Sequence, residues 1–135
     1  MIDEKFEDFE GANLDGADFE GAILEGADFK KANLEEADFV GTDLVGANLE
    51  GTDLIGANLA GADLKDANLK RANLRSANLK EANLKGADFE GAILKGALNL
   101  TIEQLSEAKT LYNAKLDDKL LIPLKEKYPT LFEKP

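Results

Sequence analysis

Carboxylates are the only side chains in this sequence whose number and spacing suggest chemistry. The 135 residues include 27 Asp and Glu but no His and no Cys, which excludes imidazole and thiolate metal sites, histidine-dependent triads, cysteine nucleophiles and disulfide scaffolds. Paired carboxylates can bind a cation or act together as acid and base. Three pairs recur at an interval of twenty residues: Asp8 and Asp28, Asp18 and Asp38, and Asp43 and Asp63.

The elements that position these pairs follow a period of five. Stepping by five through residues 9–94 meets Leu or Phe at all 18 positions, which we call the central positions. A helix would spread them around its axis, since five residues turn it by about 500°. A continuous strand would send alternate ones to opposite faces. The pattern gathers them into one core only if the chain turns a corner every five residues.

The residues around each central position support such corners. From residue 12 onward Ala lies two places before it, except at Thr42 and Thr52. Asp or Asn lies one place before it, except at Ile23 and Ile93, and all 12 glycines lie two places after it. Asn, Asp and Gly tolerate tight turns because they bond locally to the backbone or accept turn dihedrals.

These units resemble the A(D/N)LXX unit of the pentapeptide repeat family, as in Ala-Asp-Phe-Glu-Gly at residues 17–21 and Ala-Asn-Leu-Lys-Glu at residues 77–81. The resemblance covers roughly residues 7–97 and keeps its register through 18 units. It implies an all-β solenoid, a right-handed four-sided β-helix with four units per coil. The 18 units then make about 4.5 coils, and a stack at strand spacing would be on the order of 22 Å long.

Positions twenty apart lie above one another in such a stack, so Phe is confined to two facing walls. The residues predicted to fill these columns of the core are Phe9, Phe29, Leu49, Leu69 and Phe89 on one wall and Phe19, Phe39, Leu59 and Leu79 on the other. The Asp pairs then lie at outward corners, where bonds to the local backbone explain them better than catalysis does. We therefore predict no catalytic residue, no cofactor and no metal site.

Outward positions give two further expectations. The residue after the central one on the first wall alternates in charge up the stack: Glu10, Lys30, Glu50, Lys70 and Glu90. Each exposed pair is worth roughly 0.2–1 kcal/mol, which favours register control rather than binding. Six residues replace Gly at the corner: Lys31, Glu36, Asp66, Arg71, Ser76 and Glu81. Because bulky side chains resist positive φ, we expect the backbone not to require it there.

The repeat register divides the chain into three parts. Residues 1–6 are a lead-in, and Ile2 and Phe6 are available to cover the open end of the core. Residues 7–97 are the β-helix, and residues 98–135 are a C-terminal helical cap. Solenoids need such caps because each open end exposes the core.

Two short helices are predicted in the cap. Thr101 and Gln104 form a capping box at the start of the first helix. One face of this helix is expected to carry Ile102, Leu105, Ala108, Leu111 and Tyr112. Asp117 is expected to cap a second helix that carries Leu120, Leu121, Leu124 and Tyr128 and that ends at Tyr128-Pro129. Pro123 fits that helix only near its first turn.

Charge separates the rod into unequal parts. The formal net charge is −11, of which residues 1–62 carry −13, residues 63–96 carry +2 and residues 97–135 carry none. The acidic total argues against direct binding of nucleic acid, which needs a basic surface. A solvated face that keeps the rod soluble and monomeric is the simpler interpretation of the acidic part. An acidic binding face is the alternative.

Function is predicted only in outline. We favour a non-enzymatic structural or protein-interaction module, and the tail at residues 100–109 resembles that of many bacterial, notably cyanobacterial, family members. The resemblance implies one alternative, an acidic DNA mimic acting on a DNA-binding protein such as DNA gyrase, although the basic residues 63–96 count against it. An enzyme is not expected, because no candidate nucleophile has a base beside it.

Partners and location follow from the same features. We expect a protein partner, no nucleic acid, no membrane and a monomer, with dimerisation through the C-terminal helices as the alternative. The first residues lack the basic start and apolar run of a signal peptide, and no apolar stretch is long enough for a bilayer. A cytoplasmic location is therefore expected. An exported or lumenal protein whose signal peptide has been removed is the alternative.

Overall fold

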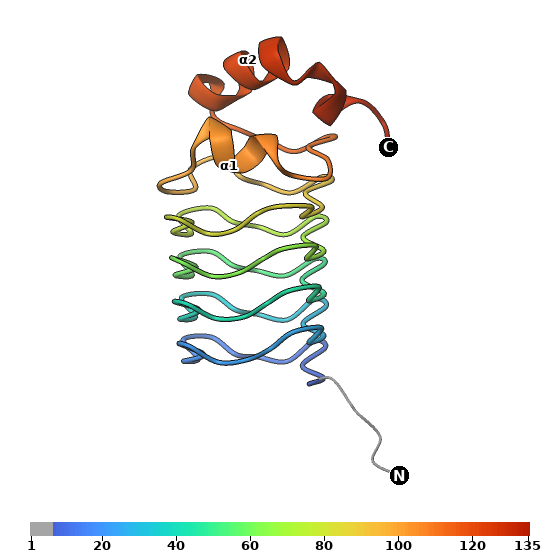
Figure 1. Cartoon of the computed structure of the whole chain (residues 1–135). Helices are drawn as coiled ribbons and strands as arrows, with labels where there is room; N and C mark the ends of the chain where they lie inside the picture. Colours follow the sequence, from blue (N-terminus) through green and yellow to red (C-terminus); the bar gives the residue numbers. More distant parts are fainter. Residues whose placement is uncertain (1–6) are drawn as a thin grey trace.

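The chain forms a rod of stacked square coils with helices at one end (Figure 1). This computed structural model describes residues 7–135, so the predicted lead-in with Ile2 and Phe6 lies outside the described residues. Fifteen consecutive parallel bridges join each residue before a central position to the residue 20 places later, from Asp8–Asp28 to Asn78–Leu98. Within residues 7–135 each wall meets the next coil through a single bridge, and no longer strand is present. The right-handed four-sided β-helix is confirmed.

Backbone hydrogen bonds between coils explain why the corner repeats every five residues. The N–H of Phe29 donates to the carbonyl of Asn48 on the next coil at 2.7 Å, and the N–H of Asn48 donates to the carbonyl of Ala27 at 2.9 Å. The corner N–H of Gly51 donates to the carbonyl of Lys70 at 2.8 Å. The same three bonds recur from unit to unit, so the stack satisfies its own backbone donors and acceptors.

The two Phe columns pack as the sequence predicts. Phe9 stacks on Phe29 with ring centroids 4.8 Å apart, and Phe19 stacks on Phe39 at 5.1 Å. The columns meet edge to face across the core, where the Phe29 and Phe39 centroids are 5.8 Å apart at 90°. Phe29, Phe39 and Phe89 are fully buried, whereas Phe9 and Phe19 in the first coil are partly buried. The Leu residues that continue both columns are also fully buried: Leu49, Leu59, Leu69 and Leu79.

The corner backbone contradicts one expectation. The six residues that replace Gly have φ between 57° and 60°: Lys31, Glu36, Asp66, Arg71, Ser76 and Glu81. The expectation that these positions do not require positive φ is wrong. The corner N–H must reach the carbonyl of the next coil, as that of Lys31 reaches Glu50 at 2.8 Å. Closure of the coil therefore outweighs a local cost of roughly 1–2 kcal/mol.

Corner side chains lie against glycines of the next coil. A Cβ added at Gly51 would lie 3.4 Å from the Lys31 side chain, and one added at Gly91 would lie 3.3 Å from Arg71. The remaining cases are Glu36 against Gly56 and Asp66 against Gly86. Glu36 and Asp66 thus leave no room for a Cβ at the glycine of the next coil, whereas Ser76 leaves the space at Gly96 open.

We predict that Gly86→Ala destabilises the protein more than Gly46→Ala, although both glycines lie in one corner column. Their φ values are 71° and 67°, so Ala costs roughly 1–2 kcal/mol at either position. A Cβ at Gly86 overlaps the carboxylate of Asp66, whereas nothing lies within 4 Å of a Cβ at Gly46. Urea unfolding should show an additional loss of about 1 kcal/mol for Gly86→Ala, which Asp66→Gly removes. Equal losses in the two backgrounds would contradict this packing.

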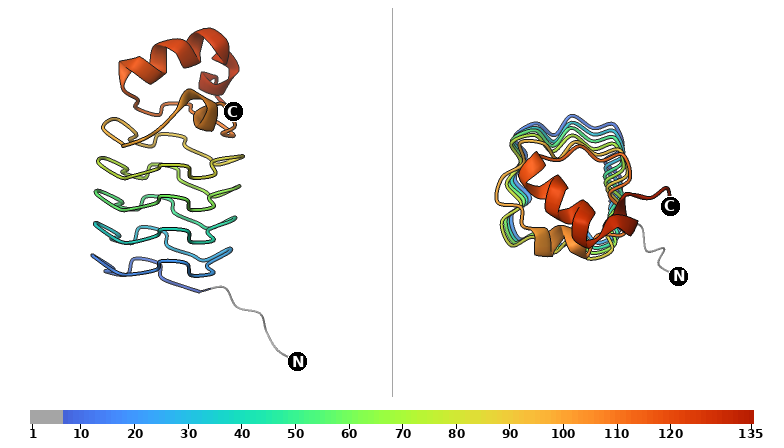
Figure 2. Two further views of the ribbon diagram at one scale, coloured as in Figure 1. Left: turned by 60° about the vertical axis from the view of Figure 1, so that its left-hand side comes forward. Right: turned by 90° about the horizontal axis from the view of Figure 1, so that it is seen from above.

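Three helices form the C-terminal end: α1 is Ile102–Ser106, α2 is Asp118–Lys127, and the 3-10 helix η1 is Pro129–Phe132. The capping box of Thr101 and Gln104 at the start of α1 is confirmed. Seen along the rod, α2 lies across the end of the stack (Figure 2). Its buried residues are Leu120 and Leu124. Among residues 7–135, no helix is long and apolar enough to cross a membrane.

The predicted helical face is wrong beyond Ser106, where α1 ends. Ala108, Leu111 and Tyr112 lie outside the helix, although Ala108 and Leu111 are buried. They belong to a further stretch of coil at residues 107–116, which resumes the path of the β-helix after α1.

This stretch contains two repeat units that the five-residue spacing conceals. Parallel bridges join Asp88 to Thr110 and Ile93 to Lys115, so the step is 22 residues rather than 20, because α1 replaces one wall by a longer path. Thr110 takes the place of the Asp or Asn of other units, since its hydroxyl accepts a hydrogen bond from the N–H of Tyr112 at 3.0 Å. The central residues of the two units are both buried: Leu111 and Leu116.

The second predicted helix differs from α2 in two respects. Asp117 is the N-cap residue but makes no side-chain cap, because its carboxylate accepts the N–H of Gly96 at 3.1 Å. Pro123 is the sixth residue of α2 rather than part of its first turn. The hydrogen bond that Pro123 removes is the one to the carbonyl of Lys119, an exposed residue, while Leu124 beside it stays fully buried.

Candidate interaction surfaces

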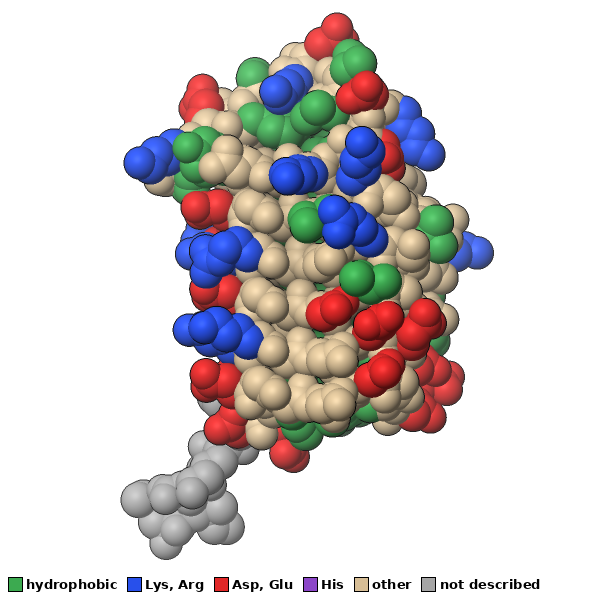
Figure 3. Space-filling view, turned by 180° about the vertical axis from the view of Figure 1, so that it is seen from behind, with side chains coloured by type: hydrophobic (Ala, Val, Ile, Leu, Met, Phe, Trp, Pro, Cys, Tyr) green, Lys and Arg blue, Asp and Glu red, His purple; other side chains and the backbone are tan. Residues whose placement is uncertain are grey.

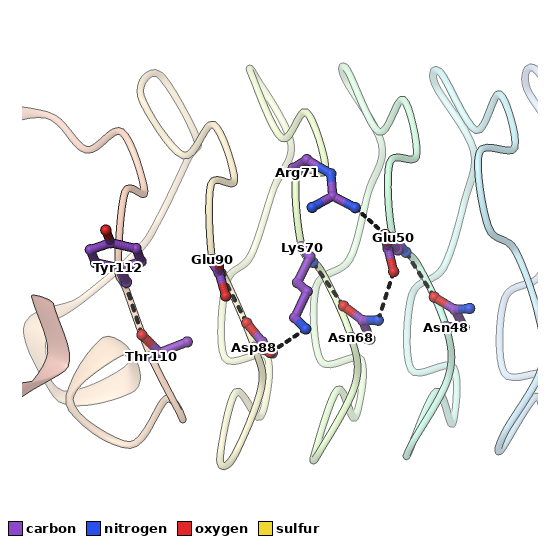
Figure 4. Close-up of polar contacts among 9 residues, drawn as sticks. All are labelled: Asn48, Glu50, Asn68, Lys70, Arg71, Asp88, Glu90, Thr110 and Tyr112. Carbon is purple, nitrogen blue, oxygen red and sulfur yellow. Dashed lines mark hydrogen bonds and ion pairs between the residues drawn. The ribbon is translucent and has the colours of Figure 1, made fainter. Parts of the chain in front are cut away.

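The carboxylates that precede the central residues belong to the turns. In the 18 units, all 16 Asp and Asn side chains at this position accept a hydrogen bond through Oδ1 from the N–H two residues later, at 2.9–3.4 Å. Asn48 accepts from Glu50 and Asp88 from Glu90 in this way (Figure 4). Asp and Asn serve equally because the turn needs only an acceptor oxygen. Turn chemistry therefore accounts for the regular spacing of Asp.

Two groups of three carboxylates nevertheless lie close together in the first two coils. One oxygen from each member lies within 4.8 Å of the others in Asp8, Glu10 and Asp28, and in Asp18, Glu20 and Asp38. The members are exposed or half-exposed, and every Asp already uses one oxygen in its own turn. Bound Ca²⁺ takes about six to eight oxygen ligands, so these open groups are not a built cation site.

The residues that directly follow the central positions form four columns, which we call edges. The first edge is Glu10, Lys30, Glu50, Lys70 and Glu90. Its ion pairs do not join successive members, as the alternating charges had suggested. Instead Glu50 pairs with Arg71, and Lys70 Nζ lies 3.7 Å from Asp88 Oδ2 (Figure 4). These are the only two ion pairs within residues 7–135, so the first edge pairs two of its five charges, Glu50 and Lys70, within the chain.

The other three edges separate charge along the rod. The second edge is Asp15, Glu35, Ile55, Arg75 and Lys95, the third is Glu20, Val40, Ala60 and Lys80, and the fourth is Glu25, Val45, Lys65 and Lys85. Each begins with acidic residues, passes through apolar ones and ends with Lys or Arg. Figure 3 shows one face on which acidic side chains gather near the N-terminal end and basic ones toward the cap. The net charge of each segment does not reveal this succession of acidic, apolar and basic residues. It appears only when outward residues twenty positions apart are compared.

A shallow hollow of about 390 Å³ lies where the cap meets the coils, lined by Lys80, Glu81, Asn99, Leu100, Thr101 and Gln104. The amide of Gln104 faces the coil backbone, since its Nε2 donates to the carbonyls of Leu79 at 2.8 Å and Ala82 at 3.0 Å. At this hollow the side-chain amide of Gln104 takes the place of the next coil's backbone N–H at the carbonyl of Ala82.

The predicted cap residues occupy different environments. Leu105 and Leu111 are fully buried in the common core. Thr101 is exposed, while Gln104 and Tyr112 are half-buried. The structure thus brings two of the five together in the core and places the others at its margin. The backbone role of Gln104 is not visible in the sequence, where its spacing from Thr101 indicates only the capping box.

The repeats decide the family. The family model for pentapeptide repeats matches residues 8–39, 32–71 and 57–96, in eight copies. The chain belongs to the pentapeptide repeat family. A search of curated proteins finds no significant match to this pentapeptide repeat protein.

Solved structures similar to this pentapeptide repeat protein include plant and cyanobacterial members. A pentapeptide repeat protein from the thylakoid lumen of Arabidopsis thaliana is 30% identical, with a TM-score of 0.55 over 89% of this chain and 72% of that chain. Rfr23 from the cyanobacterium Cyanothece 51142 is 35% identical, with a TM-score of 0.54 over 78% of this chain and 58% of that chain. QnrB1, a plasmid-mediated fluoroquinolone resistance protein, is 22% identical with a TM-score of 0.46, over 93% of this chain and 62% of that chain.

We predict that Ile23→Asn stabilises this pentapeptide repeat protein. Ile23 occupies a turn position that needs an acceptor oxygen, and its side chain is 82% exposed. Asn would supply the hydrogen bond to the N–H of Glu25, worth about 1 kcal/mol, and the melting temperature should rise by a few degrees. Ile93→Asn is the matched control, because Ile93 is half-buried and the lost packing offsets the new bond. An unchanged or lower melting temperature for Ile23→Asn would refute the prediction.

Proposed function

We propose that this pentapeptide repeat protein is a non-enzymatic structural or protein-interaction module that binds a partner protein through its flat walls. The observation that supports this is that the core residues and the Asp and Asn turn residues of the units are already used within the chain. Leu, Phe and Ala fill the interior, and the Asp and Asn of the repeats are engaged in turns. Every buried side-chain polar atom among residues 7–135 has a partner. The outward columns are then the part of each unit that is free to recognise another molecule.

The charged edges are the candidate contact points. Glu20 and Glu25 on the third and fourth edges are exposed in the first coil, and Lys80 and Lys85 are exposed on the same edges nearer the cap. None of the four takes part in an ion pair within residues 7–135. A partner of opposite charge could therefore approach either end of these edges without displacing an existing contact.

Affinity capture with the immobilised full chain tests this proposal. The chain, a Glu20→Lys/Glu25→Lys variant and a Lys80→Glu/Lys85→Glu variant are compared with lysate of the source organism. We expect one protein to be retained in near-stoichiometric amount by the unaltered chain and by one of the two variants. The proposal fails if no protein is retained above an unrelated acidic control, or if both variants retain it as well as the unaltered chain does.

An acidic DNA mimic that acts on a DNA-binding protein such as DNA gyrase is the second candidate. The observation that favours it is the concentration of negative charge in residues 1–62, which carry a net −13. The Lys and Arg residues toward the cap count against it, because a mimic of DNA should be acidic along its whole length. A supercoiling assay decides, since a mimic should inhibit gyrase at micromolar concentration and lose that effect in the Glu20→Lys/Glu25→Lys variant.

A further inference from the structure

The charges of the second edge are complementary to the charges of the same edge read in the opposite direction. From the first coil to the last repeat it reads Asp15, Glu35, Ile55, Arg75 and Lys95. Asp15 and Lys95 lie two coils on either side of Ile55, and Glu35 and Arg75 lie one coil on either side. A two-fold axis across the rod at the height of Ile55 would place each acidic residue opposite a basic residue of a second copy.

The charges of this edge are not satisfied within one chain. Glu35 and Arg75 are two coils apart, about 10 Å at strand spacing, and they form no ion pair with each other. Within residues 7–135 the only ion pairs involve the first edge and its neighbours. Asp15, Arg75 and Lys95 are exposed and Glu35 is half-exposed, so all four can meet a charge from outside.

We propose that two copies of this chain pair side by side and antiparallel through the third wall, between the second and third edges. The pairing does not depend on the proposed binding of a different protein. Ile55 of each copy lies at the two-fold axis with Ala60 of the third edge, and the same reversal places Val40 opposite Lys80 of the second copy. The charged ends of the second edge then form four ion pairs, two at each end, around this apolar centre.

The turn residues of the third wall suit this arrangement. With the axis at Asn58, Asp38 of one copy faces Asn78 of the other, and Asp18 faces Leu98, so no carboxylate faces another carboxylate. The top residue of the second edge, Asp117, extends past the first described coil of the second copy. Its carboxylate is already engaged with the N–H of Gly96.

The first edge is a built-in comparison. Reversed about Glu50, it would place Glu10 opposite Glu90 and Lys30 opposite Lys70, so like charges would meet at every level. Its members already have ion pairs within the chain at Glu50 and Lys70. The geometry therefore selects the third wall over the first as the surface for a second copy.

The size of the contact sets the expected affinity. A strip of five coils is on the order of 20 Å long, and at about 15 Å wide it would bury about 300 Å² of each copy. Stable complexes bury roughly 800 Å² per partner. The pairing should therefore be weak, with dissociation in the high micromolar range, and dimers should appear only as the concentration approaches about 1 mM.

Sedimentation equilibrium of the full chain from about 20 µM to 1 mM tests the pairing. We expect the average mass to rise toward that of a dimer, and Arg75→Glu to weaken association at least fivefold. Lys85→Glu is the matched control, since it makes the same charge change in the same coil on the fourth edge and should have no comparable effect. The double variant Glu35→Arg/Arg75→Glu exchanges the two charges and should restore association.

The outcomes separate this pairing from others. A chain that stays monomeric at 1 mM overturns it, as does equal association of Arg75→Glu and Lys85→Glu, which would point to the C-terminal helices instead. Oxidation of single-cysteine variants gives the orientation. The antiparallel pair predicts an intermolecular disulfide for Ile55→Cys but not for Arg75→Cys, and cross-linking of both would contradict the proposal.

Discussion

Ala57→Leu is expected to lower the free energy of unfolding by about 3 kcal/mol or to prevent folding, because it forces three extra carbons into a filled core. Ala57 lies two places before the central Leu59, and both residues are fully buried. The inward Ala positions of neighbouring coils, Ala37 and Ala77, are equally buried, so the column offers no room into which a Leu side chain could turn.

Ala60→Leu is the matched control for Ala57→Leu. Ala60 lies on the third edge three residues later and is half-exposed, so the same substitution should change stability by less than about 0.5 kcal/mol. Thermal unfolding followed by circular dichroism should place the melting temperature of Ala57→Leu about 10 °C below that of Ala60→Leu. Equal melting temperatures would mean that Ala57 does not point inward.

Phe29→Ala should have a comparably large effect, with a loss of about 3–5 kcal/mol. The Phe29 ring stacks on Phe9 and meets Phe19 and Phe39 edge to face, with centroids 5.7 and 5.8 Å away. Removing it leaves a cavity in the middle of the aromatic cluster and breaks all three contacts. Phe9→Ala in the same column should cost about half as much, since Phe9 is only partly buried at the end of the stack.

Urea unfolding of the two Phe variants measures this difference. A larger loss for Phe29→Ala than for Phe9→Ala supports a core that is closed on both sides of Phe29. A loss for Phe9→Ala that equals or exceeds that of Phe29→Ala would show that the first coil is buried as deeply as the second, contrary to the exposure of its side chains.

The periodic part of the fold could be predicted from sequence because each unit repeats the same physical solution. Central residues such as Phe29 and Leu59 stand at fixed spacing, and the Asx turns use one residue type at one place. The positive φ at Lys31 and Arg71 could not be predicted in the same way. Local preference opposes it, and only the closure of a four-sided coil, with its hydrogen bonds to the next coil, explains it.

The C-terminal end was less predictable because it departs from the period. The units around Thr110 and Lys115 follow a step of 22 residues rather than 20 and lack the usual Asp or Asn. Asn113, which has φ of 60°, followed by Ala114, was the remaining signal of a corner. A helical pattern that continued from Leu105 to Leu111 concealed it, since buried apolar residues three apart fit both structures.

The candidate surface could be predicted from sequence only in part. Residue types alone show an acidic N-terminal half, but the order within each edge depends on which residues share a column. Glu35 and Arg75 can be read as partners only when the twenty-residue coil is known. Likewise, the pairing of Glu50 with Arg71 rather than with its column neighbours depends on the corner geometry that brings Arg71 over the first edge.

The twenty-residue coil is the claim on which every surface in this account depends, and a pair of cysteines tests it most directly. The chain has no cysteine of its own. Lys65 and Lys85 are exposed on successive coils of the fourth edge, and Cα atoms on adjacent coils lie about 5 Å apart, within the range of a disulfide. Lys65→Cys/Lys85→Cys should therefore oxidise fully to an intramolecular disulfide, whereas Lys65→Cys/Lys80→Cys, on different edges, should not. A disulfide in the second variant but not in the first would contradict the coil.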